Sequence, residues 1–337
     1  MKSIQKYKLT FTPLTPCHIG SGHQYEPFEY VFRNNIFYKI NIGLLLSDLP
    51  NEKIEDFYKL CDGGSIVDLR NLIAKKFDTN PEKYTLFTAE TTGSIQKHYT
   101  EKFNDYQNQL QINACQHSSL SQKPLLPGSS IKGAIRTAVL AVLAEGNELK
   151  PFKFEEYLLR YKNPSEDPFK FINVSDAEFP LNSTKIYFVY NRPRDANYEE
   201  KEGLPPFAAE FLSSIICINK DNEMDFQESP SFASVNFVVK QRFKVEDLFD
   251  DCKSFYTNLL SSTKDLWKNF DNENLYEFLL KSASKRNNSF LLRCGRFSGK
   301  ESFCVPQVMD NKIPKCINLA GGSLFCGWFK VVWEKIN

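Results

Sequence analysis

A turn, two hydroxyl side chains and two cations stand together at the start of a predicted helix. They belong to the sequence LLPGSSIKGAIRTAVLAVL at 125–143, and they are Gly128, Ser129, Ser130, Lys132 and Arg136. Glycine permits a tight turn, and one of the serines could accept hydrogen bonds from the first free backbone N–H groups of the helix. Lys132 and Arg136 are four residues apart, so both project from one face beside the positive end of the helix dipole. These residues predict an anion site suited to phosphate, against the alternative of an ordinary capped helix with two surface cations.

Two other segments end a strand-like run in glycines and polar residues. One is LTFTPLTPCHIGSG at 9–22, and the other is LLRCGRFSG at 291–299. Their candidate functional residues are His18, Gly20, Ser21, Arg293, Arg296, Ser298 and, just beyond the second run, Lys300. Each run therefore predicts a strand that ends in a polar, glycine-rich loop.

Taken together, the three segments resemble the RAMP superfamily of CRISPR-associated RNA-binding proteins. The resemblance rests on a strand ending in L-x-P-x-H-I-G-S-G, the helix start P-G-S-S-I-K-G-x-x-R and a late glycine-rich loop. The length, the order of the motifs and the closing GGSLFCGWFKV are most similar to the subunit that caps the crRNA 3′ end in the type III-A (Csm) effector complex. The resemblance runs from Tyr7 to Trp333, and residues 51–121 match no part of it.

The resemblance implies a non-catalytic subunit that binds crRNA and supports crRNA maturation and antiviral defence, without a cofactor or a metal. In RAMP proteins a glycine-rich loop brings backbone N–H groups close to RNA, while basic side chains hold the phosphates. The implied RNA contacts are His18, Gly20, Ser21, Ser129, Ser130, Lys132, Arg136, Arg293, Arg296, Ser298 and Lys300. The implied partners are single-stranded crRNA, the backbone RAMP subunit, the small helical subunit of the Csm complex and host nucleases that trim the guide, but no membrane.

Other functions stay open at this point. A metal-independent endoribonuclease that processes CRISPR transcripts would use His18 as general acid or base, although no histidine partner is evident. The chain could also occupy another RAMP position, such as the subunit that binds the crRNA 5′ handle or the capping subunit of a type III-B complex. Asp176 and Glu210 are predicted to form salt bridges within the complex, and the pair Asp250 and Asp251 is a weak candidate for Mg²⁺.

Hydrophobic periodicity predicts the elements that position these residues. Strands are expected at 6–15, 30–40 (a hairpin with Asn34-Asn35 at its turn), 171–175, 185–191, 232–243, 290–294 and 323–333. Helices are expected at 54–60, 67–77, 128–144, 154–161 and 245–285, while 97–112 is a helix or an insertion. The order βαββαβ predicts an α+β, ferredoxin-like or RRM-like (RAMP) core with large insertions.

The RAMP resemblance adds an expected arrangement of these elements. The first strand lies beside the late glycine-rich loop, and the helix at 128–144 packs behind the sheet. An N-terminal half at 1–178, with a helical insertion at about 51–121, is followed by a C-terminal half at 179–337. One continuous domain and a second, degenerate ferredoxin-like unit both remain open.

Composition allows this reading and excludes others. The chain has 337 residues, 42% of them hydrophobic, which is enough for a sizeable core. The net charge of +1 excludes a protein coated in positive charge, so a nucleic-acid surface must come from local clusters. The basic clusters are 132/136, 192/194, 240/242/244, 281/285/286 and 293/296/300, and the acidic ones are 51–56, 199–202 and 221–228. The absence of a long apolar run or a signal-peptide core predicts a cytoplasmic protein.

The nine cysteines are expected to be reduced, mostly buried thiols. No two of them have CxxC spacing. Cys294, Cys304, Cys316 and Cys326 are spaced regularly enough for zinc to be considered, but they lack the close pairs of a structural zinc site. No metal site is therefore predicted.

Overall fold

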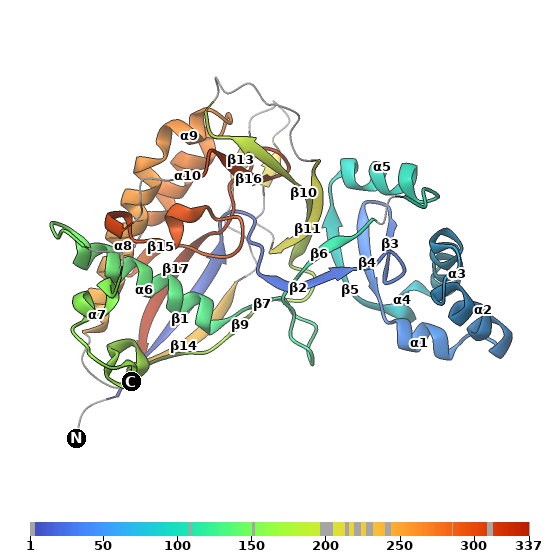
Figure 1. Ribbon diagram of the computed structural model, residues 1–337, viewed down its shortest axis with the longest axis horizontal. Helices are drawn as coiled ribbons and strands as arrows, with labels where there is room; N and C mark the ends of the chain where they lie inside the picture. Colours follow the sequence, from blue (N-terminus) through green and yellow to red (C-terminus); the bar gives the residue numbers. More distant parts are fainter. Residues whose placement is uncertain are drawn as a thin grey trace.

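Two β-sheets organise the chain in the computed structural model. The structure describes residues 4–107, 110–149, 152–195, 205–212, 216–218, 224–226, 232–239, 244–284, 286–308 and 313–336. The first sheet is covered by helices, and the second extends away from it toward a group of short helices at the far end of the molecule (Figure 1). Lys240, Arg242 and Lys285, the acidic stretch 199–202 and most of 221–228 lie outside the described residues.

The first sheet has five strands in the order β15-β17-β1-β14-β8. They are β1 (Gln5–Pro13), β8 (Ile172–Val174), β14 (Ala233–Val239), β15 (Ser289–Arg293) and β17 (Trp328–Ile336). With helices α6 (Gly128–Ala144) and α8 (Val245–Ser262), the elements β1, α6, β8, β14, α8 and β17 follow one another in βαββαβ order. Neighbouring strands are all antiparallel. The predicted ferredoxin-like α+β core is therefore confirmed.

The sequence predicts two late strands without showing which one completes the core. The predicted strand at 290–294 is β15, which lies at the edge, whereas β17 takes the place beside β1. The predicted strand at 323–333 begins only at Trp328, because Gly327 before it has φ +90° and lies against the loop that follows β15. Both strands are apolar, so their sequences alone do not show which one pairs with β1.

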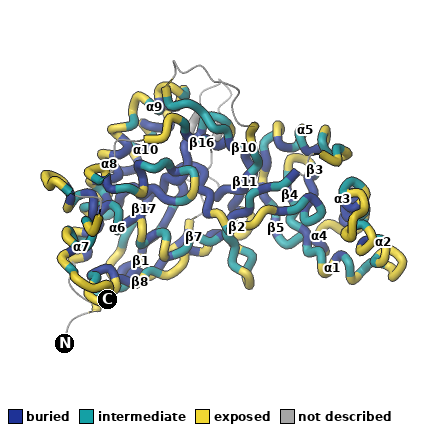
Figure 2. The backbone as a smooth tube through the Cα atoms, in the orientation of Figure 1, coloured by how far each residue is buried: buried dark blue, intermediate teal, exposed yellow. Residues whose placement is uncertain are grey.

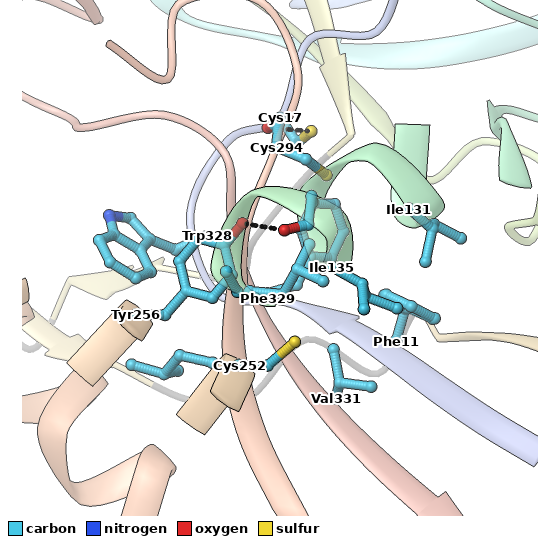
Figure 3. Close-up of a cluster of buried hydrophobic side chains, with 14 of the residues drawn as sticks. Phe11, Cys17, Ile131, Ile135, Cys252, Tyr256, Cys294, Trp328, Phe329 and Val331 are labelled. Atoms are coloured by element: carbon cyan, nitrogen blue, oxygen red, sulfur yellow. Dashed lines mark hydrogen bonds between the residues drawn. The ribbon is translucent and has the colours of Figure 1, made fainter. Parts of the chain in front are cut away.

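One large apolar core lies between the first sheet and helices α6 and α8. Figure 3 shows Ile135 of α6 in this core with Phe11 of β1 and Phe329 of β17. The hydroxyl of Tyr256 on α8 donates a hydrogen bond of 3.0 Å to the carbonyl of Ala134 and so joins the two helices. The predicted packing of the 128–144 helix behind the sheet is confirmed.

The second sheet joins eight strands from distant parts of the chain. In order across the sheet they are β2 (Gly20–Tyr25), β6 (Ile112–Cys115), β11 (Phe207–Leu212), β10 (Thr184–Pro193), β5 (Thr85–Thr91), β4 (Ile36–Ile40) and β3 (Tyr30–Arg33), and β16 (Cys316–Ala320) also pairs with β10. The pairs β5–β10 and β6–β11 are parallel. The predicted β3–β4 hairpin is confirmed, and Asn34 and Asn35 have the positive φ values (53° and 59°) that a tight two-residue turn requires.

The segment 51–121 holds strands as well as helices. Its helices are α2 (Asn51–Cys61), α3 (Ile66–Phe77), α4 (Pro81–Tyr84) and α5 (Gly93–Lys102), and α1 (Ile42–Ser47) precedes them. Strands β5 and β6 of the same segment were not predicted. Strand β6 has only four residues and pairs with β11 through two of them. Each sheet contains strands from both sides of residue 178, so the division into two halves stays a prediction.

The remaining elements are mostly short. They are α7 (Phe154–Leu159), α9 (Lys264–Lys268), α10 (Glu273–Ser284), β7 (Leu125–Leu126), β9 (Ala177–Glu178), β12 (Ile216–Ile218), β13 (Met224–Phe226), and the 3₁₀ helices η1 (Pro164–Glu166), η2 (Pro168–Phe171), η3 (Lys300–Ser302) and η4 (Pro306–Val308). The predicted helix at 245–285 is divided into α8, α9 and α10, with Asp271 in the left-handed conformation at the second break. None of the described helices is long and apolar enough to cross a membrane.

Candidate nucleic-acid interface

The glycine-rich loop after β15 lies directly against the end of β1. The Arg296 N–H donates to the His18 carbonyl at 2.8 Å, and the Gly327 N–H donates to the Pro16 carbonyl at 2.9 Å. Gly295 has φ +94°, and a Cβ there would lie 2.9 Å from the His18 oxygen, so only glycine fits this approach. The predicted meeting of strand end and loop is therefore confirmed.

A hollow of about 460 Å³ opens where this loop meets helix α6. The helix presents small residues to it, among them Ser130 and Gly133. The strand end contributes Gly20, and the loop contributes the cationic Arg296 and the aromatic Phe303. The hollow thus brings all three sequence motifs together, with small residues that leave the backbone open to a ligand.

A second hollow of about 750 Å³ shares Arg296 and Phe303 with the first, and its lining adds the ring of Phe207 and Lys300. We call these two hollows the loop groove. Phe303 is 62% exposed, and the exposed Arg296 makes no ion pair with any carboxylate in the described part of the chain. A third, aromatic hollow of about 420 Å³ shares Pro205 and Phe207 with the loop groove and continues it toward α5. The loop groove therefore combines cationic and aromatic side chains, and the third hollow adds further rings beside it.

Six of the predicted RNA contacts line the loop groove in different ways, and the buried Arg293 among them is described in the next paragraph. Gly20, Ser130, Arg296 and Lys300 line it with backbone, hydroxyl or cationic groups. Ser298 also lines it, but its Oγ donates a hydrogen bond of 2.7 Å to the carbonyl at the start of the loop. Ser298 is buried, so it holds the shape of the loop.

Arg293 and two further candidates are buried, hydrogen-bonded within the chain or outside the groove. Arg293 is buried in the wall of the groove, where its Nε donates to the Cys326 carbonyl at 3.1 Å and its guanidinium lies 5.1 Å from the Trp328 ring centre. Burial lowers the pKa of Arg293. The hydroxyl of Ser21 donates to a carbonyl of β6, and Ser129 is exposed on α6 outside the lining of the groove.

The structure does not bring Lys132 and Arg136 to the loop groove. Neither lines it, because the helical repeat turns Lys132 about 160° and Arg136 about 120° around the axis of α6 from Ser130. Arg136 lies 2.7 Å from a carboxylate oxygen of Glu155 and 2.8 Å from one of Asp167. The sequence predicted the shared face of the two cations, but the guanidinium expected to bind phosphate is held by two carboxylates of the same chain.

The start of α6 is capped by a carboxylate and not by a serine, which corrects the sequence prediction. Pro127 at the N-cap position offers no side-chain hydrogen bond, and the Gly128 N–H donates to Oδ1 of Asp176 at 2.7 Å. A Cβ on Gly128 would lie 2.2 Å from the Val174 carbonyl oxygen, so glycine is needed here for close packing against β8. The negative Asp176 stands where the predicted phosphate would bind, so the helix start already holds an anion.

His18 is fully buried beneath the loop groove. Its Nδ1 carries a proton, because it donates at 2.7 Å to the backbone carbonyl of Glu210, which can only accept. Its ring packs near the rings of Phe211 and Phe297, with centroids 5.5 and 5.2 Å away, and burial lowers its pKa. Nε2 has no hydrogen-bond partner among the described residues. A neutral, buried imidazole supports the strand end and is not placed to contact RNA.

A buried ion pair, which was not predicted from the sequence, lies inside the second sheet. Glu210 accepts hydrogen bonds from the Tyr25 hydroxyl at 2.8 Å and the Cys115 N–H at 3.0 Å, and its other oxygen lies 2.9 Å from Nε2 of His117. Nδ1 of His117 donates to the Gln122 carbonyl at 2.8 Å. Burial acts to raise the pKa of Glu210 and lower that of His117, but their mutual contact outweighs it and leaves the Glu210 pKa below its usual value and the His117 pKa above. Glu210, which was predicted to form salt bridges within the complex, thus forms an ion pair with His117 of its own chain.

The thiols are consistent with the predicted buried, reduced state. All eight cysteines with described side chains are free, and five of them are buried. Burial raises the pKa of Cys326 to about 12, so this thiol is unreactive. Within the described ranges no three His, Cys, Asp or Glu side chains are placed to share a metal ion.

Comparison with known proteins assigns the family. The sequence matches the model of the RAMP superfamily over residues 10–285. The chain belongs to the RAMP superfamily. This RAMP protein is 26% identical over 312 residues to the CRISPR system Cms protein Csm5 of Methanocaldococcus jannaschii, covering 82% of the chain and 68% of that relative. It is 23% identical over 211 residues to the protein of the same name from Streptococcus thermophilus, covering 59% of the chain and 58% of that relative.

Solved structures share the fold of this RAMP protein over nearly its whole length. A chain of a Csm–crRNA–target RNA ternary complex from a type III-A CRISPR-Cas system matches with a TM-score of 0.69 and 17% identity, covering 97% of this chain and all of that one. The crystal structure of T. onnurineus Csm5 matches with a TM-score of 0.63 and 18% identity, covering 96% and 99%. At these identities the likeness shows a common fold.

Proposed function

We propose that this RAMP protein is a non-catalytic subunit of a type III-A Csm effector complex that binds crRNA and caps its 3′ end. Two relatives named Csm5 and the fold shared with a chain of a Csm–crRNA–target RNA complex support this proposal. The observation that carries it is the loop groove, where the three motif segments meet around Arg296 and Phe303.

The groove offers single-stranded RNA two kinds of contact. Arg296 and Lys300 supply positive charge for phosphates, with Arg296 exposed at the point where the two hollows meet. Phe303 and Phe207 supply rings on which bases could stack whatever their identity. Such a surface holds a strand of any sequence, as a guide-binding subunit must, since guides differ in their bases.

The proposed role is to hold the guide in place, and the buried His18 is not available for acid–base catalysis. The ring of His18 is buried and one of its nitrogens donates to a backbone carbonyl, so it cannot reach an RNA 2′-hydroxyl. Burial also lowers its pKa. By holding the end of the guide, the subunit would limit where host nucleases trim it. Its protein neighbours would be the backbone RAMP subunit and the small helical subunit.

The test replaces Arg296 and Phe303 together by alanine in the host and maps the 3′ ends of crRNAs in the isolated complex. The matched control replaces Arg160 and Phe152, an exposed cation and an exposed ring outside the groove. Guides that lengthen or scatter at their 3′ ends in the double variant, and not in the control, support the proposal. Unchanged 3′ ends in a fully assembled complex would contradict it, and a defined cut of repeat RNA by the pure chain in EDTA would favour the endoribonuclease instead.

A further inference from the structure

Helices α2 and α3 form an open groove at the end of the molecule farthest from the first sheet (Figure 1). The groove has a volume of about 820 Å³. Its apolar lining comes from the half-buried Leu49, Leu60 and Leu72. Figure 2 shows many exposed residues along α2 and α3. Their buried residues, Phe57 and Ile73 among them, pack in one cluster with Val31 of β3. The groove is separate from the loop groove and shares no residue with it.

Basic side chains outnumber acidic ones in the lining of this groove, whereas acidic side chains outnumber basic ones in the segment around it. Residues 48–84 contain eight acidic and six basic side chains. The groove, by contrast, is lined by two aspartates and four lysines, Lys53, Lys59, Lys75 and Lys76. The ammonium of Lys53 pairs with Asp56 at 3.0 Å, and that of Lys76 donates to the backbone carbonyl of Asp48 at 2.9 Å.

Two of the four lysines supply charge that the chain does not neutralise by ion pairing. Lys59 and Lys75 are exposed, one on each helix, and neither forms an ion pair with a carboxylate in the described part of the chain. Each of the two helices also contributes a leucine to the lining, Leu60 on α2 and Leu72 on α3. A ligand that fits must therefore carry apolar groups along its centre and negative charge on both edges.

We propose that this groove docks an acidic amphipathic helix of a protein partner. Two packed helices with an apolar groove between them accept a third helix, whose leucine-type residues at i, i+3, i+4 and i+7 fill the groove. Glutamates or aspartates flanking that stripe would face Lys59 and Lys75. RNA fits less well, because the lining has no aromatic ring and no arginine with which to stack bases or grip phosphates. This surface is independent of crRNA binding and goes beyond the function proposed above.

The test measures binding of a fluorescein-labelled helical peptide of about 18 residues to the full chain by anisotropy. The peptide has leucines at i, i+3, i+4 and i+7 and glutamates on both flanks, and a scrambled peptide of the same composition serves as the reference. The test variant is Lys59→Glu with Lys75→Glu, and the matched control is Lys97→Glu with Lys268→Glu, two exposed lysines outside the groove.

The proposal predicts that the amphipathic peptide binds the native chain at least about tenfold more tightly than the scrambled peptide does. The groove variant should lose about tenfold or more of this affinity, and the control variant should keep it. Equal binding of the scrambled peptide, equal loss in the control, or no binding at all would overturn the proposal. Displacement of the peptide by oligouridine RNA in the native chain would overturn it in favour of an RNA site. The groove variant should bind RNA through the loop groove as the native chain does, which separates this test from that of the proposed function.

Discussion

Replacing Glu210 by glutamine removes one charge from the buried ion pair and keeps the size of the side chain. The carboxylate accepts hydrogen bonds from Tyr25 and Cys115 and contacts His117, and an amide has one oxygen with which to replace them. The change also leaves the His117 imidazolium without its counter-ion. Breaking one side of a buried pair costs about 3–5 kcal/mol, and because His117 can release its proton we expect about 3 kcal/mol less free energy of unfolding.

The pH dependence of this loss has a definite sign. The pKa of Glu210 is lowered in the folded chain, so its contribution to stability is present above the unfolded pKa of about 4.3 and is lost as pH falls through the folded value. The pKa of His117 is raised, so its contribution is complete below the unfolded pKa of about 6.5 and is lost as pH rises through the folded value. The native chain should therefore lose some stability as pH rises above the unfolded histidine value of about 6.5, and the Glu210→Gln variant should lack this loss.

Urea unfolding followed by tryptophan fluorescence at pH 6 and pH 8 measures both effects. The control is Glu90→Gln, which neutralises a carboxylate on strand β5 of the same sheet that is 76% exposed and pairs with Lys185 at 3.5 Å. An exposed pair contributes little, so this control should unfold close to the native chain. A loss below about 1 kcal/mol for Glu210→Gln, or the same pH profile as the native chain, would refute the buried ion pair.

Three further substitutions test two corrections to the sequence predictions and one confirmed contact. Asp176→Ala removes the acceptor at the start of α6 and should lower the free energy of unfolding by about 1 kcal/mol, measured by urea unfolding; no change would mean that the carboxylate does not cap the helix. Arg136→Ala should lower the melting temperature by a few degrees and leave RNA affinity within about twofold, because the guanidinium bridges two carboxylates of its own chain; a loss of RNA affinity with native melting would restore the predicted phosphate contact. Gly295→Ala should destabilise the chain by about 1–3 kcal/mol, because φ is +94° and the new Cβ would lie 2.9 Å from the His18 oxygen; native stability would show that the loop is free to move from β1.

The ferredoxin-like core could be predicted from the sequence because its elements are long and strongly patterned. Along β1 the side chains of Tyr7, Leu9 and Phe11 are buried in alternation, and α6 is apolar around most of its circumference. Beyond the β3–β4 hairpin and the strand at 185–191, the second sheet could not be predicted, because the parallel pairs β5–β10 and β6–β11 each join through only two residues from parts of the chain that are far apart. Such long-range pairing leaves no local periodicity in the sequence from which it could be predicted.

The sequence predicted that three segments meet at the candidate site, and the structure confirms this. Each segment is the end of a strand or helix, which glycine and polar residues mark in the sequence. The roles of single residues were harder to predict. A cation and a carboxylate at unrelated positions, such as Arg136 and Asp167, leave no trace of their contact in the sequence. Nor does an i, i+4 spacing reveal which side of a helix faces the ligand, as Lys132 shows. Arg296 and Lys300, which were predicted as RNA contacts, do line the loop groove, and the glycines around them mark the loop in the sequence; their contact with RNA stays a prediction.

The most direct test of the account is the affinity of the full chain for a single-stranded RNA, measured over a range of salt concentrations. Arg296→Ala should weaken binding and reduce the slope of log affinity against log salt by about 0.7, the value for one phosphate contact on a single strand. Phe303→Ala should weaken binding at least about fivefold with an unchanged slope, since it removes a stacked ring and no charge. Native affinity and native slope in both variants would contradict the proposal that RNA lies in the loop groove.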